Sequence, residues 1–151
     1  MAFEFVLDTA ILAKAENLKI VLVTNGQINE PYLEQLLPYV SAWNIDLKSF
    51  SEAGYRKLGG SFSTALRTIE RAQAEAHVEI TTLVVPGISD DPDDMREQAK
   101  YLASLNPDIP LHLSRYFPYY NYNAPATDKT RMMELKHIAE RYLNRVQLGN
   151  I

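Results

Sequence analysis

An acidic and a basic residue stand two positions apart in the segment Asn44-Ile45-Asp46-Leu47-Lys48. Residues i and i+2 of a β-strand point to the same face, so the carboxylate of Asp46 and the ammonium of Lys48 are expected side by side. Burying two such charges costs several kcal/mol unless they pair with each other or with a ligand. The spacing therefore predicts either a structural ion pair at a strand end or a site for a zwitterionic ligand.

Polar and apolar residues also alternate in two later segments, and each segment has one polar face. Glu79 and Thr81 share the polar face of the first segment, and His112 and Ser114 share that of the second. A parallel sheet covered by helices on both faces is apolar on both. Half-polar strands instead indicate a partial barrel whose outer face carries helices and whose inner face lines a polar cavity. An antiparallel meander with one wet face is the alternative, and helices between the strands argue against it.

The elements that must position these residues follow from hydrophobic periodicity. Helices are expected over 3–14, 31–39, 62–76, 91–105 and 129–143, and strands over 19–24, 43–48, 78–85, 109–114 and 145–148. Strands that are each preceded by a helix imply crossovers, a parallel sheet and one α/β unit. The β-branched run within 19–24 is typical of a strand buried on both faces. Ligands of such sheets bind at the carboxyl ends of the strands.

Composition narrows the classes of function. The 151 residues contain no cysteine, which excludes disulfides, thiolate metal sites and a cysteine nucleophile within this chain. A net charge of -4 with scattered basic residues argues against nucleic acid and anionic membranes as partners. No apolar run approaches the length of a membrane span, and no signal peptide is recognisable, so a cytoplasmic location is expected.

Three further features have competing interpretations. The acidic run 90–94 precedes a helix and is better explained by capping than by a cation site. Of the histidines, only His112 falls on the expected cavity face, whereas His77 and His137 are expected at the surface, and the three lack metal-binding spacing. The tyrosine-rich segment 116–123 is interpreted either as a packing loop or as a surface for a substrate or partner.

Several short strings in the chain match one family in order and spacing. They are Val-Thr-Asn-Gly (23–26), Asn-Ile-Asp-Leu-Lys (44–48), Tyr-Arg-Lys-Leu-Gly-Gly (55–60), Leu-Val-Val-Pro-Gly (83–87) followed by Asp-Asp (90–91), Leu-His-Leu-Ser-Arg-Tyr-Phe-Pro (111–118) and a terminal Leu-Gly-Asn (148–150). Together they resemble the later part of a radical S-adenosylmethionine (SAM) domain of the pyruvate formate-lyase-activating-enzyme type, most closely its AmmeMemoRadiSam-system branch. The resemblance covers essentially the whole chain.

The resemblance implies an α/β fold, a partial TIM-type barrel with parallel strands. In the family, a Cys-x3-Cys-x2-Cys loop after the first strand holds a 4Fe-4S cluster, and Gly-Gly-Glu-Pro after the second binds SAM. Neither motif occurs in residues 1–151, so the chain is expected to lack the first two βα units and to span strands three to six plus a C-terminal helix and strand. The helix at residue 3, with no strand before it, agrees with this expectation.

The resemblance also assigns site residues. Asp46 and Lys48 match the family's Asp-x-Lys, which contacts SAM, and Thr24 with Asn25 match a Thr-Asn near the same ligand. The family has an Asp before that Thr-Asn, where it helps to hold a monovalent cation; Val23 stands there in this chain and puts such a cation in doubt. The family's histidine at the end of the sixth strand corresponds most closely to Tyr116, with Arg115 and His112 as neighbours. These three residues and Ser114 complete the predicted cofactor-binding set.

The implied activity is reductive cleavage of SAM to a 5′-deoxyadenosyl radical, which abstracts a hydrogen atom from a glycyl-radical enzyme or another substrate. Without the cysteine loop, this chain is expected to be inactive alone. The alternative hypothesis is a non-catalytic α/β interaction module or remnant. Such a module would use the tyrosine-rich segment and the exposed edge of the strand near 20–24, which would also favour an edge-strand dimer.

Overall fold

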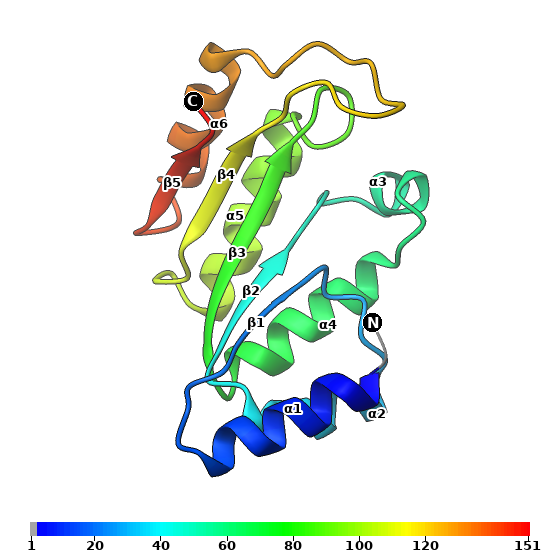
Figure 1. The fold of residues 1–151 in the computed structure, drawn as a ribbon. Helices are drawn as coiled ribbons and strands as arrows, with labels where there is room; N and C mark the ends of the chain where they lie inside the picture. The colour runs from blue at the N-terminus through cyan, green and yellow to red at the C-terminus, as the bar shows by residue number, and fades with distance from the viewer. Residues whose placement is uncertain (1–2) are drawn as a thin grey trace.

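The computed structural model describes residues 3–151, which form one parallel sheet and its connecting helices (Figure 1). The strands are β1 (Val21–Thr24), β2 (Ala42–Asp46), β3 (His77–Val84), β4 (Leu111–Arg115) and β5 (Val146–Gly149). The α-helices are α1 (Phe3–Ala15), α2 (Glu30–Leu36), α3 (Glu52–Lys57), α4 (Phe62–Gln73), α5 (Pro92–Leu105) and α6 (Lys129–Ala139), and a short 3-10 helix, η1 (Leu37–Tyr39), follows α2.

The order of the strands in the sheet is their order in the chain, β1-β2-β3-β4-β5, and every neighbouring pair is parallel. Each crossover therefore advances one strand in the same direction. Because such crossovers are right-handed, they place the connecting helices on one side of the sheet. Figure 1 shows α4 and α5 on the same side of the strands. This winding is that of a partial (βα) barrel with an open sheet, and it confirms the predicted fold class.

The two faces of the sheet differ in polarity. On the face toward the helices, the outer face, Trp43, Ile45, Ile80, Leu111 and Leu113 are at most 1% exposed and belong to one hydrophobic core. The opposite, inner face carries half-buried polar residues. They are Asn44, Asp46, Glu79, Thr81, His112 and Ser114. The alternation in the sequence thus correctly predicted a helix-covered apolar face and a polar face.

Strand β1 departs from the prediction of a strand buried on both faces. Val21 and Val23 are 62% and 73% exposed, whereas Leu22 between them packs against the core. Within residues 3–151, β1 pairs only with β2 and lies at the edge of the sheet. The β-branched run correctly predicted a strand, but it did not reveal that the side of Val21 and Val23 is uncovered.

Other differences are local. The strand expected over 43–48 ends at Asp46, so Lys48 lies in the loop that follows. The six-residue helix α3 was not predicted, because one and a half turns are too short for a periodic signal. Ser51 caps α3, since its Oγ accepts a hydrogen bond from the Gly54 backbone N–H at 3.1 Å.

The acidic run before α5 acts as a cap, as predicted. One carboxylate oxygen of Asp91 accepts hydrogen bonds from the backbone N–H groups of Asp93 and Asp94 at 2.8 and 3.1 Å. Asp90 accepts another from the N–H of Gly87 at 2.7 Å. Among the helices of residues 3–151, none combines the length and the hydrophobicity that a membrane crossing requires.

Candidate functional site

The parallel register lines up the polar side chains of the inner face in rows. Asp46 lies opposite Thr81, and Thr81 lies opposite His112 on the next strand. One row nearer the amino ends of the strands, Asn44 lies opposite Glu79. Residues that are far apart in the chain therefore form one continuous polar surface across β2, β3 and β4.

Hydrogen bonds connect these rows. The Thr81 hydroxyl donates to Oδ1 of Asn44 at 2.9 Å. Glu79 contacts two imidazoles, with Oε1 at 3.1 Å from Nε2 of His77 and Oε2 at 2.8 Å from Nε2 of His112. These hydrogen bonds, that of His77 foremost, hold the pKa of Glu79 below its ordinary value. Glu79 is therefore an ionised acceptor between two histidines at neutral pH.

Asp46 and Lys48 form the ion pair that their spacing suggested. Nζ of Lys48 donates to Oδ2 of Asp46 at 2.8 Å. The two side chains are 35% and 42% exposed, so the charges are not buried and the large desolvation cost considered from the sequence does not apply. An exposed pair of opposite charges at the carboxyl end of a strand can exchange its internal contact for the two charges of a zwitterion.

Tyr55 holds the backbone of this site. Its hydroxyl oxygen accepts a hydrogen bond from the backbone N–H of Lys48 at 3.3 Å, and its ring packs at 5.7 Å from that of Phe62. Tyr55 is only 2% exposed, and burial raises the pKa of its hydroxyl. The buried tyrosine thus connects α3 to the loop that carries Lys48.

Thr24 and Asn25 shape the turn after β1. Thr24 lies opposite Ile45, which places it on the outer side of the sheet, and its Oγ1 accepts from the N–H of Gly26 at 3.2 Å. Asn25 is exposed, and its Oδ1 accepts from the N–H of Gln27 at 3.0 Å. A Cβ on Gly26, where φ is +70°, would lie 3.1 Å from Cγ2 of Ile45, so the turn requires glycine.

Two predicted residues at the end of β4 are engaged elsewhere. Nε of Arg115 donates to the carbonyl of Thr127 at 2.7 Å, and its guanidinium lies 4.7 Å from the ring centre of Phe117. The Tyr116 hydroxyl donates to the carbonyl of Tyr122 at 2.6 Å, and Tyr116 is 7% exposed. These contacts connect both side chains to the loop after β4.

Ser114 remains on the inner face, opposite Leu83. The structure therefore brings four of the predicted residues to one surface at the carboxyl half of the strands. They are Asp46, Lys48, His112 and Ser114.

The tyrosine-rich loop, residues 116–123, is partly pinned and partly exposed. Tyr122 donates its hydroxyl hydrogen to the carbonyl of Pro86 at 2.9 Å, whereas Tyr119 and Tyr120 are each 86% exposed. Tyr116 and Tyr122 also line a cavity of about 460 Å³ with Leu83 of the inner face. The base of the loop therefore packs, as the first interpretation predicts, and its tip is exposed; that the tip is a surface for a substrate or partner stays a prediction.

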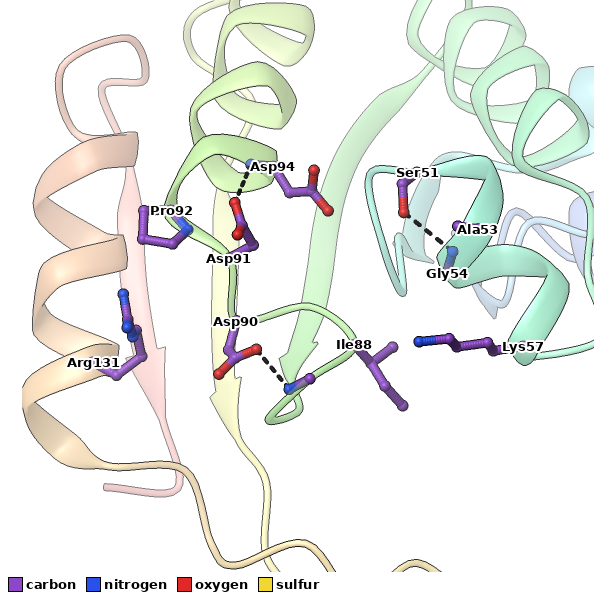
Figure 2. Close-up of a pocket in the computed structure, with 11 residues that line it drawn as sticks. Ser51, Ala53, Gly54, Lys57, Ile88, Asp90, Asp91, Pro92, Asp94 and Arg131 are labelled. Atoms are coloured by element: carbon purple, nitrogen blue, oxygen red, sulfur yellow. Dashed lines mark hydrogen bonds between the residues drawn. The ribbon is translucent and has the colours of Figure 1, made fainter.

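A second cavity, of about 470 Å³, lies between the start of α3 and the start of α5 (Figure 2). Figure 2 shows Asp94 on one side of it, Ser51 on the other and Lys57 pointing toward Ile88. Burial, reinforced by the neighbouring Asp91 and Asp93, raises the pKa of Asp94. Asp91 caps α5 and Asp90 accepts from the Gly87 N–H in the turn before it, so both carboxylates are engaged within this segment.

Sequence reasoning missed two of the residues that organise the site. His77 lies at the surface, as expected, but its contact with Glu79 on the same strand was not predicted; the i, i+2 spacing could have revealed this contact. Tyr55 carried no such signal, because its contact with Lys48 depends on how α3 folds back. No cluster of three or more potential ligands suited to a metal ion is present within residues 3–151.

The one-directional winding and the polar inner face define a partial-barrel protein. Residues 1–99 match the radical SAM superfamily, and the chain belongs to it. The chain is 32% identical over 142 residues to a Methanocaldococcus jannaschii protein, MJ1632, that is provisionally named a glycyl-radical enzyme activating enzyme; the match covers 89% of this chain and 54% of that protein. It is 30% identical over 153 residues to the uncharacterised MJ0808 of the same organism, with coverage of 99% and 45%.

Solved structures agree on the fold. A domain of pyruvate-formate lyase-activating enzyme from Bacteroides vulgatus superposes with a TM-score of 0.81 at 20% identity, covering 98% of this chain and 91% of that one. A radical SAM methyltransferase from Sphaerobacter thermophilus superposes with a TM-score of 0.65 at 16% identity, covering 88% and 41%. The chain spans about half the length of the curated relatives it matches.

Membership in this superfamily implies SAM and a 4Fe-4S cluster as cofactors. The accessible, oppositely charged pair of Asp46 and Lys48 fits the zwitterionic amino-acid end of SAM. The cluster does not fit the residues of this chain, because iron–sulfur clusters are held by cysteine thiolates and the sequence contains no cysteine. Of the two cofactors, the residues of this chain fit SAM and do not fit the cluster.

Proposed function

We propose that this chain supplies the SAM-holding part of a radical SAM site of the pyruvate formate-lyase-activating type. The observation that carries the proposal is the exposed pair of Asp46 and Lys48 at the carboxyl end of β2, beside a polar inner face. The reaction class is reductive cleavage of SAM followed by hydrogen abstraction, and the bound cofactors supply that chemistry.

The residues of the chain have distinct tasks in this proposal. The Asp46 carboxylate accepts hydrogen bonds from the ammonium group of SAM, and the Lys48 ammonium donates to its carboxylate. Tyr55 keeps the backbone of Lys48 in place through the 3.3 Å hydrogen bond. His112 lies in the same row as Asp46, and Ser114 lies one row further along β4. His112 and Ser114 therefore border the space where the remainder of SAM extends. Thr24 and Asn25 act by shaping the turn after β1.

The chain corresponds in this proposal to strands three to six of the family barrel, with the C-terminal helix and strand. Thiolates for the cluster must come from residues outside the chain, because it has no cysteine. Alone it binds SAM without cleaving it. MJ1632 is provisionally named a glycyl-radical enzyme activating enzyme, and a glycyl-radical enzyme or another protein substrate is the partner that we propose.

Calorimetric titration of the 151-residue chain with SAM tests this function. Saturable binding is expected, and Asp46→Asn and Lys48→Gln should each weaken it about tenfold, corresponding to the loss of one charged contact of about 1.4 kcal/mol. Lys100→Gln is the matched control, because Lys100 is an exposed lysine paired with Glu97 on α5. Absence of SAM binding, or equal binding by all three variants, would refute the proposal.

The second candidate function is a non-catalytic interaction module. The exposed Val21 and Val23 on the edge strand, with the 86% exposed Tyr119 and Tyr120, favour it. An unpaired edge of this kind can add a strand from a second copy. Light scattering at increasing concentration distinguishes the two candidates, because a dimer that does not bind SAM supports the module and a SAM-binding monomer excludes edge pairing.

A further inference from the structure

Glu79 and its two histidines form a cluster, of which the SAM site proposed above involves His112 but neither Glu79 nor His77. Both carboxylate oxygens of Glu79 are in contact with an imidazole Nε2, that of His77 at 3.1 Å and that of His112 at 2.8 Å. The side chains of His77, Glu79 and His112, the glutamate–histidine cluster, are 53%, 36% and 30% exposed. The cluster is therefore accessible from the side of the sheet opposite the core.

The hydrogen-bonding capacity of the cluster is not exhausted. An ionised carboxylate only accepts hydrogen bonds and has about four positions for them, so each imidazole must donate through Nε2. Two positions on Glu79 then remain free. The cluster thus presents further acceptor positions on an ionised carboxylate. A hydrogen-bond donor with positive charge is its chemical complement.

The surroundings supply an apolar neighbour. Val23, Asn44 and Glu79 follow one another across β1, β2 and β3 in a single row. With strands about 4.8 Å apart, Val23 lies about 9.5 Å from Glu79 along that row. Because Val21 and Val23 are largely exposed on the same face, a ligand with a short aliphatic chain can cover a valine while its charged end reaches the carboxylate.

We propose that the glutamate–histidine cluster binds the ammonium group of an aliphatic amine, with Val21 and Val23 contacting the alkyl chain. Glu79 precedes Thr81, the register partner of Asp46, by two residues, so the two sites are about one row, or 6.6 Å, apart along the strands. The binding of this amine does not depend on the proposed function.

The test is a nuclear magnetic resonance titration of the isotope-labelled 151-residue chain with three probes, n-hexylammonium chloride, n-hexanol and sodium hexanoate, at equal ionic strength and neutral pH. Saturable shifts of the His77 and His112 side-chain signals are expected with hexylammonium alone. Glu79→Gln should weaken the binding at least about tenfold. Glu97→Gln is the matched control, because Glu97 is an exposed glutamate on α5 that pairs with Lys100, and it should leave binding unchanged.

Equal shifts with hexanol, preferential binding of hexanoate, or no saturable shift with hexylammonium would each overturn the proposal. If Glu79→Gln does not fold, the comparison of the three probes on the unsubstituted chain still tests whether the cluster binds an ammonium group. Titration of the Glu79→Gln variant with SAM separates this inference from the proposed function. If the variant retains SAM binding and loses hexylammonium binding, the two sites are distinct. If the unsubstituted chain binds hexylammonium but not SAM, the proposed function is refuted and the amine site is supported.

Discussion

Nζ of Lys48 lies 2.8 Å from Oδ2 of Asp46, although Lys48 is two residues beyond the end of β2. Exposed ion pairs contribute between about 0 and 1 kcal/mol to stability, because water screens them and ordering two side chains has an entropic cost. The pair is therefore readily opened by a ligand that offers better partners. Its arrangement favours recognition over structural support.

Asp46→Asn should accordingly leave the fold almost unaffected. The free energy of unfolding is expected to change by less than about 1 kcal/mol, because only a solvated ion pair is lost. Denaturant unfolding of the variant and the parent chain measures this change. A much larger loss of stability would show that the pair is structural and would remove the argument for a ligand.

Tyr55→Phe should act on the site through Lys48. The substitution preserves the packed ring but removes the acceptor of the Lys48 backbone N–H. Loss of one such hydrogen bond lowers stability by about 0.5–1.5 kcal/mol. We expect several-fold weaker SAM binding together with a shifted amide signal of Lys48. Tyr32→Phe, at an exposed tyrosine of α2, is the control, and an unchanged SAM affinity in Tyr55→Phe would contradict the positioning role.

The buried polar pair Thr82 and Gln98 should behave as a coupled unit. The Thr82 hydroxyl donates to the carbonyl of Leu47 at 3.0 Å and accepts from Nε2 of Gln98 at 2.8 Å, and both side chains are at most 2% exposed. Thr82→Val leaves the Gln98 amide unsatisfied and should lower stability by about 1–3 kcal/mol. Adding Gln98→Leu should recover part of that loss. Additive losses in a double-mutant cycle would argue against coupling.

Gly54 permits a close approach between α3 and the loop before it. A Cβ at this position would lie 2.6 Å from Cβ of Ser49 and would collide with its Oγ. Gly54→Ala should therefore destabilise the chain by about 1–3 kcal/mol, the range for overpacked sites. Ser49→Gly in the same chain removes both clashing atoms and should restore part of the stability in thermal unfolding. Failure of this second substitution to help would locate the strain elsewhere.

The lowered pKa of Glu79 predicts that the stability of the chain depends on pH. Its folded-state pKa lies below the ordinary value of 4.5, so its stabilising contribution is fully present above pH 4.5 and disappears as the pH falls through the folded-state pKa. Glu79→Gln should show a shallower loss of stability below pH 4.5 than the parent chain. Glu97→Gln, an exposed glutamate on α5, is the control. Parallel curves for parent and Glu79→Gln would exclude the contribution.

Part of the fold was predictable from the sequence. Hydrophobic periodicity predicted the helices α1, α2, α4, α5 and α6 and the strands β2 to β5, because each is long enough to show a pattern. Strand β1 was predicted from its continuous β-branched run. Helix α3 was not predicted, because its six residues are too few to show a helical period. The exposure of Val21 and Val23 on β1 was not predicted either, because valines in a β-branched run are typical of a buried strand.

The sequence by itself determined the polar inner face and the contact between Asp46 and Lys48, since these depend on spacing within one segment. It also determined the parallel α/β winding, which follows from the order of helices and strands along the chain. Only the tertiary structure decided that His112 meets Glu79, that Tyr55 holds Lys48, and that Arg115 and Tyr116 turn into the loop after β4. The physical reason is that such contacts join separate elements. They depend on strand register and on how the connecting loops return to the sheet, which the periodicity of one segment does not encode.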